Sequence, residues 1–321
     1  MSRTFQFLAV LPLLAASVVA DDTFLTVEEA GPDYAIQGEY TGEIKHDDQA
    51  FRLGFQVIAL GDHKFNGVAY PGGLPGDGWT GEEKFPSSGE TKDGQTKIVD
   101  PEHGHAIISA GKAVLFDKEG KELGTLAKVE RKSPTLGAKP PEGAMVLFDG
   151  KSADHFKGGK LTMKDLLAPD CETNEKFSDH KLHIEFRTPF RPAARGQERG
   201  NSGVYIQGRY ECQVLDSFGL EGENNECGGI YSISKPKVNA CFPPLTWQTY
   251  DMDFTDARYE NGKKVKNARV TIKHNGIVIH DDVELTHGTP GKNPEADGPD
   301  VIYLQGHGNP VVYRNIWVVK K

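Results

Sequence analysis

The chain has 321 residues, of which 37% are hydrophobic and 26% charged, and its formal net charge is −9 at pH 7. This length predicts two domains, although one large sandwich with a long insertion also fits it. An acidic chain without a stripe of Lys and Arg lacks the positive surface that nucleic-acid binding requires, so we expect no nucleic-acid partner. The 37 Gly and 19 Pro residues indicate short strands joined by many turns, and therefore an all-β protein.

Residues 1–20 have the three parts of a secretory signal peptide. Arg3 supplies the positive start, residues 5–14 are an apolar run, and residues 18–20 (Val-Val-Ala) form a small-residue cleavage site. A membrane anchor is the alternative, but the run is shorter than the ~20 residues that a spanning helix needs, and Pro12 interrupts it. We therefore expect an exported protein, periplasmic or extracellular, that begins near Asp21 and has no membrane span.

The first half of the sequence contains short predicted strands separated by turns. Residues 51–60, FRLGFQVIAL, alternate and then become continuously apolar, which predicts a strand that ends at the turn Gly61-Asp62. Such spacing favours a small β barrel or sandwich over residues 21–130, which we interpret as an accessory domain. Further strands are predicted at residues 65–70, 96–99, 105–109, 113–116 and 123–129.

Two motifs in this half are candidate binding features. The Gly-, Pro- and Trp-rich residues 71–81 could form a loop that binds a polysaccharide, but a structural turn beside a buried Trp79 is the simpler interpretation. His103 and His105 would share one face of an extended segment. Two imidazoles without a third ligand favour a turn over a metal site.

Residues 131–143, RKSPTLGAKPPEG, predict a linker between two domains. The segment is rich in Pro, Gly and charged residues and has no periodicity. The second domain, residues 144–321, then opens with an apolar strand at 145–148 that is closed by an Asp-Gly turn.

Several segments of the second half alternate cleanly. In residues 182–187, LHIEFR, one face is Leu, Ile and Phe and the other is His, Glu and Arg. The Asn275-Gly276 pair predicts a hairpin with a type I′ turn. The whole pattern indicates an antiparallel jelly-roll sandwich of two sheets, one of them with a polar face. The other predicted strands are at residues 210–214, 250–254, 269–273, 277–280, 301–305 and 311–319.

All four cysteines lie in the second half of the chain, at Cys171, Cys212, Cys227 and Cys241. They lack the CxxC spacing of zinc sites, so we expect no zinc centre. An oxidising compartment would permit disulfides, and Cys227 with Cys241 is the preferred pair because a Gly-rich strand follows Cys227 and a Pro-Pro turn follows Cys241. Four buried thiols are the alternative.

The segment 211–216 carries the clearest chemical signal. Glu211, Gln213 and Asp216 fall at i, i+2 and i+5, which resembles the strand on which jelly-roll glycanases mount paired carboxylates, with a bulge accounting for the odd offset. Gln213 stands between the two acids here. This departure argues against ordinary glycoside hydrolysis by two carboxylates.

Six ordered blocks of sequence resemble the 3-keto-disaccharide hydrolase domain, a concanavalin-like jelly roll common in exported bacterial proteins. The resemblance covers about residues 144–321, and six blocks in order are more specific than a lone motif. The blocks are LFDGK (147–151), RGNSGVYIQGRYECQVLDS (199–217), CGGIYSI (227–233), WQTYD (247–251), NARVTIKHNGIVIHDDVEL (267–285) and LQGHGNPVVYRNIWV (304–318).

This resemblance implies action on an oxidised sugar substrate, a glycoside with a ketone at C3. The ketone acidifies the hydrogen at C2, so a general base can remove it, the C1 substituent can leave by elimination, and water can then add to give net hydrolysis. Such a route needs a base near C2, a donor or metal at the C3 oxygen, and an acid for the leaving group. It does not need two matched carboxylates.

Three residues are the candidates for catalysis. Glu211 is the first choice for base or metal ligand, because it lies on the polar face of the best-matched strand; the alternative is a surface carboxylate paired with Arg187 or Arg209. His307, between glycines in QGHGN, could transfer a proton or bind a metal, or could make a structural hydrogen bond. Asp216 is interpreted as an Asx-turn residue or metal ligand rather than a nucleophile.

Five further residues are candidates for holding the sugar. Amide and guanidinium groups match the donors and acceptors of sugar hydroxyls, and a tyrosine ring can pack on the sugar. Trp247 and Trp317 are expected in the core. Spacing does not decide whether a divalent metal ion is a cofactor. The five candidates are Asn201, Tyr205, Gln213, Gln248 and Arg314.

Three functions remain open at this stage. The favoured one is an exported enzyme that cleaves 3-keto-glycosides, since the blocks include polar residues on strands and in the Gly-rich loop. The alternatives are a noncatalytic carbohydrate-binding jelly roll, because fold alone does not fix function, and a conventional glycosidase that uses Glu211 and Asp216. The three functions differ in whether the protein turns over a glycoside and in whether that glycoside must carry the ketone.

Overall fold

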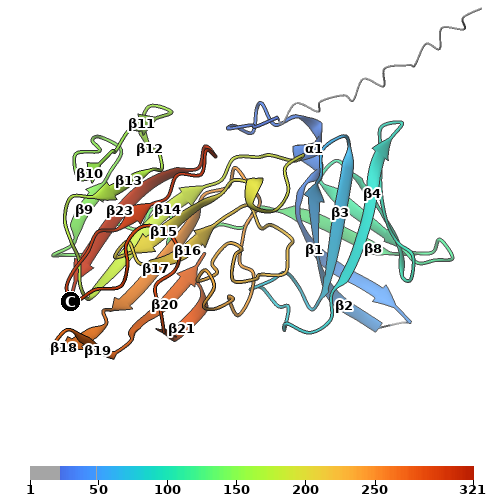
Figure 1. The fold of residues 1–321 in the computed structure, drawn as a ribbon. Helices are drawn as coiled ribbons and strands as arrows, with labels where there is room; N and C mark the ends of the chain where they lie inside the picture. Colours follow the sequence, from blue (N-terminus) through green and yellow to red (C-terminus); the bar gives the residue numbers. More distant parts are fainter. Residues whose placement is uncertain (1–21, 48) are drawn as a thin grey trace, which may run out of the picture.

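The computed structural model describes residues 22–321 except residue 48, and it is almost entirely β-structure (Figure 1). The predicted signal peptide lies outside the described residues. Among the described residues, no helix has the length and apolar character needed to cross a membrane. One short helix, α1 (Gly31–Ile36), precedes the first strand.

The first half of the chain forms a closed antiparallel barrel of eight strands, drawn in blue to teal in Figure 1. Each strand pairs with the next along the chain, and the first pairs with the last, so the sheet has no free edge. This confirms the predicted small barrel. The strands are β1 (Gly38–His46), β2 (Gln49–Ala59), β3 (Lys64–Pro71), β4 (Phe85–Lys92), β5 (Gln95–Asp100), β6 (Gly104–Ser109), β7 (Lys112–Phe116) and β8 (Glu122–Val129).

The second half forms the predicted sandwich, drawn in green to red in Figure 1. One sheet has five strands in the order β10-β13-β22-β15-β16, namely β10 (Phe156–Lys157), β13 (Cys171–Thr173), β22 (Tyr303–Leu304), β15 (Ser202–Ile206) and β16 (Tyr210–Val214). The larger sheet runs β11-β12-β23-β14-β17-β20-β21, with β9 beside β23. Its strands are β9 (Met145–Phe148), β11 (Leu161–Thr162), β12 (Leu166–Leu167), β14 (His180–Arg187), β17 (Gln248–Thr255), β20 (Ala268–His274), β21 (Ile277–Leu285) and β23 (Val312–Lys320).

Two small elements complete the sandwich, a 3₁₀ turn η1 (Gly196–Glu198) and a separate hairpin of β18 (Arg258–Glu260) and β19 (Lys263–Lys266). The turn between β20 and β21 has positive φ at both Asn275 (51°) and Gly276 (81°). Two successive positive φ angles define the type I′ turn that the Asn-Gly pair predicts.

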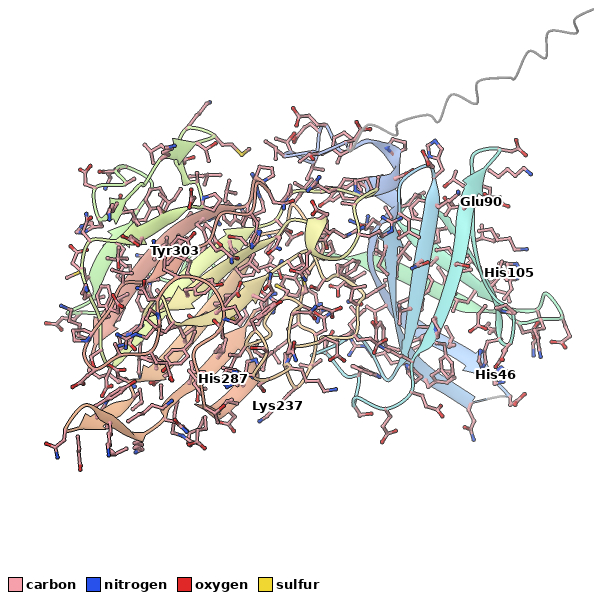
Figure 2. All side chains as sticks on the ribbon, in the orientation of Figure 1. His46, Glu90, His105, Lys237, His287 and Tyr303 are labelled. Carbon is pink, nitrogen blue, oxygen red and sulfur yellow. The ribbon has the colours of Figure 1, made fainter. Side chains whose placement is uncertain are left out.

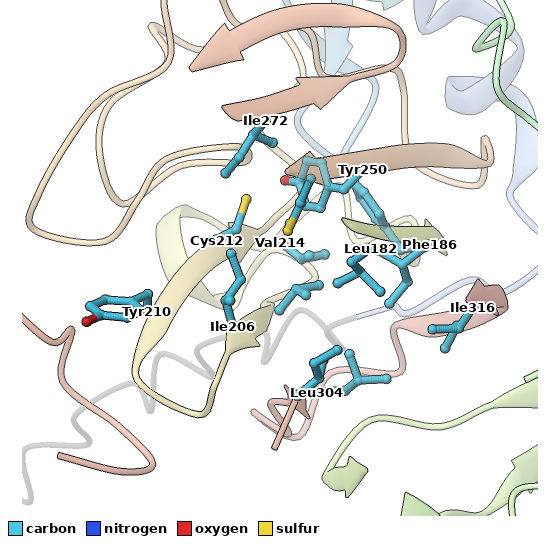
Figure 3. Close-up of a cluster of buried hydrophobic side chains, with 14 of the residues drawn as sticks. Leu182, Phe186, Ile206, Tyr210, Cys212, Val214, Tyr250, Ile272, Leu304 and Ile316 are labelled. Atoms are coloured by element: carbon cyan, nitrogen blue, oxygen red, sulfur yellow. The ribbon is translucent and has the colours of Figure 1, made fainter. Parts of the chain in front are cut away.

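Alternate residues of the two sheets meet in one apolar core (Figure 3). Leu182 and Phe186 of β14 face Val204 of β15 and Cys212 of β16 across the sandwich, and all are at most 2% exposed. Because side chains alternate along a strand, the residues between these positions point away from the core. Glu211 therefore lies on the outer face of the five-stranded sheet.

The expected linker, residues 131–143, lies against the outer face of the larger sheet. The hydroxyl of Ser133 is 2.6 Å from that of Thr249, and Thr135 donates to Asp251 over 2.6 Å. Farther along, the carbonyl of Ala138 accepts from the Trp317 indole over 3.3 Å. We call residues 131–143 the strap. It joins β8 to β9, and the division of the chain into domains at this segment stays a prediction.

The barrel and the sandwich share apolar packing at one end of the barrel. Phe190 and Leu245 from the sandwich half belong to the apolar cluster that fills the barrel, and Phe190 is fully buried against Phe24 and Tyr34. The Arg199 guanidinium also donates to the carbonyl of Ala59 at the end of β2. Phe190 and Leu245 of the sandwich half therefore fill this end of the barrel together with Phe24 and Tyr34.

Three expectations about particular side chains need revision. The four cysteines are free, buried thiols, so the alternative to the preferred disulfide is the one observed; Cys227 and Cys241 are neighbours but are not bonded. Trp79 is only half-buried, packed edge-on against Tyr70 in the turn-rich stretch. Trp247 and Trp317 are also half-buried rather than in the core.

Candidate functional site

Four polar or aromatic side chains form a row across the outer face of the five-stranded sheet. Glu172 on β13 pairs with Tyr303 on β22, Tyr303 with Tyr205 on β15, and Tyr205 with Glu211 on β16. Their neighbours along the strands, such as Leu304, face the core. The register of the sheet thus brings together residues that are up to 131 positions apart in the sequence.

Glu211 is a buried carboxyl with one hydrogen-bond donor. Only 4% of the residue is exposed, and the hydroxyl of Tyr205 donates to Oε2 over 2.8 Å. Burial raises the pKa of Glu211 to about 7, against the opposing effect of the Tyr205 hydrogen bond. Protonated and ionised forms therefore coexist near neutral pH, which is the condition a general acid–base catalyst requires.

Two oxygen acceptors converge above Gly203. Oε1 of Glu211 and Oε1 of Gln305 both lie close to the position that a Cβ of residue 203 would occupy, so any larger residue would collide with Glu211. The Gln305 oxygen is buried and has no hydrogen-bond partner among the described residues, while its amide nitrogen donates to Tyr205 over 3.0 Å. An acceptor left without a donor indicates a place where a ligand hydroxyl, or the proton of Glu211, can bind.

Gln213 and Asn201 extend this cluster along the same face. Gln213 pairs with Gly203 in the sheet, and its amide donates to Asn201 Oδ1 over 2.8 Å. Asn201 in turn donates to the side chain of Gln197 over 3.0 Å. These contacts hold both amides next to Glu211, and the sugar-binding role of Gln213 and Asn201 stays a prediction.

The other end of the row is open to solvent. Tyr303 is half-exposed and is labelled in Figure 2, and the ammonium of Lys292 lies 4.8 Å from the centre of its ring. Lys292 also pairs with Glu172 over 2.7 Å. A half-exposed aromatic ring beside charged groups is a suitable platform for a sugar face.

His307 lies exposed in the loop that follows Gln305. Its carbonyl accepts a hydrogen bond from the Asn309 side chain over 3.2 Å. The described contacts do not link its imidazole to Glu211. The structure thus places His307 two residues from the cluster, and its role stays a prediction.

Three other predicted residues lie away from Glu211. Asp216 is buried, ion-paired to Arg199 over 2.8 Å and bonded to the backbone of Phe218, which is an Asx turn. Gln248 lies between the sheets, where its oxygen accepts from Phe242 N over 2.9 Å. Arg314 is on the outer face of the larger sheet. The structure therefore assembles only Asn201, Tyr205, Glu211 and Gln213 of the predicted set.

The alternative interpretation of Glu211, a surface ion pair with Arg187 or Arg209, does not occur among the described residues. Arg187 lies near Trp247, on the larger sheet, and Arg209 bonds Gln207 and pairs with Asp300. Glu211 is instead buried, with Tyr205 as its hydrogen-bond donor. Its environment is that of a buried carboxyl with a raised pKa rather than of a solvated one.

Sequence reasoning missed Gln305, Tyr303, Lys292 and Glu172. Tyr303 and Gln305 flank Leu304, the first residue of the LQGHG block, and this alternation was a usable signal. Strand β22 has only two residues, however, and its pairing with β15 joins segments about a hundred residues apart. Local alternation in the sequence does not predict this strand pairing.

A second polar cluster lies under the strap, on the outer face of the larger sheet. Glu185 accepts from Arg314 over 2.7 Å and from Asn315 over 2.9 Å, and His183 bonds Asp251 over 2.6 Å. Burial opposes ionisation of Glu185, but these hydrogen bonds and those from His183 and the strap lower its pKa to about 2. A fully paired carboxylate of this kind stabilises the packing and has no free position for a substrate.

The described residues contain no group of three or more His, Cys, Asp or Glu side chains placed to hold a metal ion. The two oxygens above Gly203 are ligands of the type that hard divalent cations prefer. They would supply two of the six or more oxygens that such an ion needs.

The sandwich half of the chain matches a known family. The model of the 3-keto-alpha-glucoside-1,2-lyase-like domain matches residues 143–319. The chain belongs to this family. The matched region contains the whole sandwich and every residue of the Glu211 cluster, whereas the barrel lies outside it.

One solved structure supports this assignment. A protein from Parabacteroides distasonis, described as a "putative glycosyl hydrolase", is 30% identical over 56% of this chain and 85% of its own, with a TM-score of 0.52. Two others from that organism with the same description are 17% and 20% identical, with TM-scores of 0.42 and 0.39, each over 56% of this chain and 94% and 99% of their own. A search of the curated proteins found no match. Family membership supports a carbohydrate-active enzyme.

Proposed function

We propose that this chain cleaves 3-keto-glycosides at the Glu211 cluster, by removing the proton at C2 of the sugar. The observation that carries the proposal is the buried carboxyl of Glu211, whose pKa is about 7 and whose Oε1 lies beside an unpaired acceptor above Gly203. A base whose pKa is near the working pH is ionised in a large fraction of the molecules and is still basic enough to take a proton from the substrate.

The proposed reaction is an elimination followed by a hydration. Glu211 takes the C2 proton, and the C–H electrons form an enolate with the C3 ketone. As the ketone re-forms, C1 and C2 become doubly bonded and the C1 oxygen leaves with its electrons, taking a proton to become an alcohol. Water then adds its hydroxyl to C1 and a proton to C2, so the net change is hydrolysis.

Other residues of the cluster have supporting roles in this proposal. The amides of Gln213 and Asn201 hold sugar hydroxyls, and the half-exposed ring of Tyr303 packs on the sugar. His307 is the candidate that hands a proton to the leaving oxygen, because it lies in the loop directly after Gln305. We further propose that the protein acts outside the cytoplasm, as the composition of residues 1–20 indicates.

A conventional glycosidase is less compatible with the structure. Such an enzyme needs a second carboxyl across the scissile bond, at a fixed distance from the first. Asp216, the expected partner of Glu211, is fully buried and ion-paired with Arg199. It cannot reach a substrate without breaking that pair.

The test is turnover of a 3-keto-glucoside with a chromogenic leaving group, beside its unoxidised parent. Both are assayed with chelator and with added divalent cations, using wild type, Glu211→Gln and the control Glu260→Gln, which changes an exposed residue of β18. We expect release from the keto substrate alone, lost at least a hundredfold in Glu211→Gln and retained in the control. Release from the parent would favour a conventional glycosidase, and release from neither a noncatalytic binding protein.

A further inference from the structure

The end of the barrel that faces away from the sandwich is not filled by side chains. Strands β1 and β2 run from the sandwich end to the pair His46 and Gln49, and a cavity of about 560 Å³ lies at that far end. Figure 2 labels His46 and His105 on this side of the barrel, away from the sandwich. An eight-stranded barrel is wide enough to hold one small ligand where its side chains leave room.

The floor of the cavity is apolar. Leu53, Phe55, Ile98 and Ala106 line it and are at most 5% exposed. These residues belong to the cluster that continues to Phe190 at the sandwich end. The cavity is therefore blind, and it admits a molecule from one side only.

Aromatic side chains form the walls nearer the mouth. Phe51 is 38% exposed although it lines the cavity, and Phe85 and Phe116 are half-exposed. Each of the last two has a histidine against it, with His103 4.5 Å from Phe85 and His105 stacked 5.0 Å from Phe116. Open aromatic surface of this kind marks a binding site for apolar ligands.

The mouth carries charges of both signs. Three basic residues (Lys45, Lys118, Lys121) stand among five acidic ones (Asp47, Asp100, Glu102, Asp117, Glu119). No positive field is concentrated there to attract a carboxylate or phosphate. Asp100 also holds the His103 ring in place over 2.8 Å.

We propose that this end of the barrel binds an uncharged small molecule that contains an aromatic ring. The apolar floor and phenylalanine walls take the ring, the mouth disfavours an anion because it carries more acidic than basic residues, and the volume is in the range of small-molecule sites. The sandwich covers the opposite end of the barrel, so the occupant is not the sugar bound at Glu211. This site is independent of the proposed catalytic function.

The probe is N-phenyl-1-naphthylamine, an uncharged two-ring compound that fluoresces more strongly in apolar surroundings, titrated into the full chain. We expect saturable binding at one site per chain. Phe51→Ser should weaken it about tenfold, since it removes one aromatic wall. Ala69→Phe, which fills the cavity, should abolish it. Leu161→Ser, a change at a 46% exposed residue of the sandwich, is the control and should leave binding unchanged.

Three outcomes would overturn the proposal: no binding by wild type, equal binding by wild type and Phe51→Ser, or equal competition by naphthoate and naphthalene, since naphthoate carries a charge. Thermal unfolding followed by circular dichroism checks that each variant is folded. Phe51→Ser changes a partly exposed residue, so it tests the site even where Ala69→Phe does not fold.

Discussion

At the scale of single residues, the chemistry depends on one carboxyl. Glu211 ionises near neutral pH because burial penalises its charged form, while Tyr205 partly offsets that penalty. A general base works only when ionised. We therefore expect kcat/KM on a 3-keto-glucoside to rise with pH through an apparent pKa near 7 and then level off.

Tyr205→Phe tests the source of this pKa. The variant removes the hydrogen bond that lowers the pKa of Glu211, so the rise of kcat/KM should move to higher pH. Tyr259→Phe, on the separate hairpin, is the matched control and should leave the profile in place. An unchanged profile in Tyr205→Phe would show that another group titrates.

The same carboxyl links stability to pH. A group whose pKa is raised on folding stabilises the protein below its unfolded pKa, and this stabilisation is lost as pH rises through the folded value, here about 7. Glu211→Gln avoids that loss. The free energy of unfolding of Glu211→Gln minus that of wild type, both measured in urea, should therefore be larger at pH 8 than at pH 4. We expect this difference to grow by of the order of 3 kcal/mol between the two pH values. An equal difference at the two pH values would contradict the raised pKa.

Gly203 tests whether space above the sheet matters. Its φ is not in the left-handed region, so alanine fits the backbone, but the added Cβ would collide with Glu211 Oε1. We expect Gly203→Ala to lower kcat/KM at least tenfold and stability by about 1–3 kcal/mol through overpacking. Gly288→Ala is the control, because the nearest atom to its Cβ would belong to the flexible side chain of Glu295, and the backbone of Arg209 would lie at an ordinary van der Waals distance. Full activity of Gly203→Ala would place the substrate elsewhere.

At the scale of strands and turns, alternation in the sequence correctly predicted which residues of a strand face outward. It did not predict which residues of the neighbouring strands lie beside them. The polar positions of 210–214 indicated that Glu211 and Gln213 share a face, and the structure places both there. Asp216 follows the end of β16, where alternation no longer applies, and an Asx turn directs it inward instead. Gln248, predicted to hold a sugar hydroxyl, faces the core, where its oxygen accepts from the backbone N–H of Phe242.

The strap is the element whose environment the sequence predicted least. Its Pro- and Gly-rich composition indicated a free linker, yet its hydroxyls bond the outer face of the larger sheet. Those bonds depend on Thr249 and Asp251, more than a hundred residues away, which local composition does not reveal. Side-chain partners can make a segment without periodicity part of a sheet surface.

Thr135→Val tests the attachment of the strap. Valine keeps the shape of threonine but cannot bond Thr249 or Asp251, so we expect a loss of about 1–2 kcal/mol in the free energy of unfolding. Lys139→Ala, at an exposed position of the same segment, should change stability by less than about 0.5 kcal/mol. Equal stability of both variants, measured in urea, would mean that the strap is only loosely held.

At the scale of the whole molecule, the two halves are joined by more than the strap. The composition and the spacing of turns predicted a small barrel before a sandwich, and both are present. The sequence did not indicate that residues of the sandwich half fill one end of the barrel, because Phe190 lies in a loop segment with no strand periodicity. The burial of Phe190 depends on how the barrel packs against the sandwich half.

Phe190→Ala should therefore loosen the barrel although the residue belongs to the other half. Removing a fully buried ring costs about 3–5 kcal/mol, and here the cavity would open between Phe24, Tyr34 and the barrel interior. We expect faster hydrogen exchange of the β2 and β3 amides in the variant, followed by mass spectrometry of peptides. Leu161→Ala, on the distant edge strand β11, should leave them unchanged. If exchange instead increased only in the sandwich, the barrel would be stable without this contact, and the two halves would unfold independently.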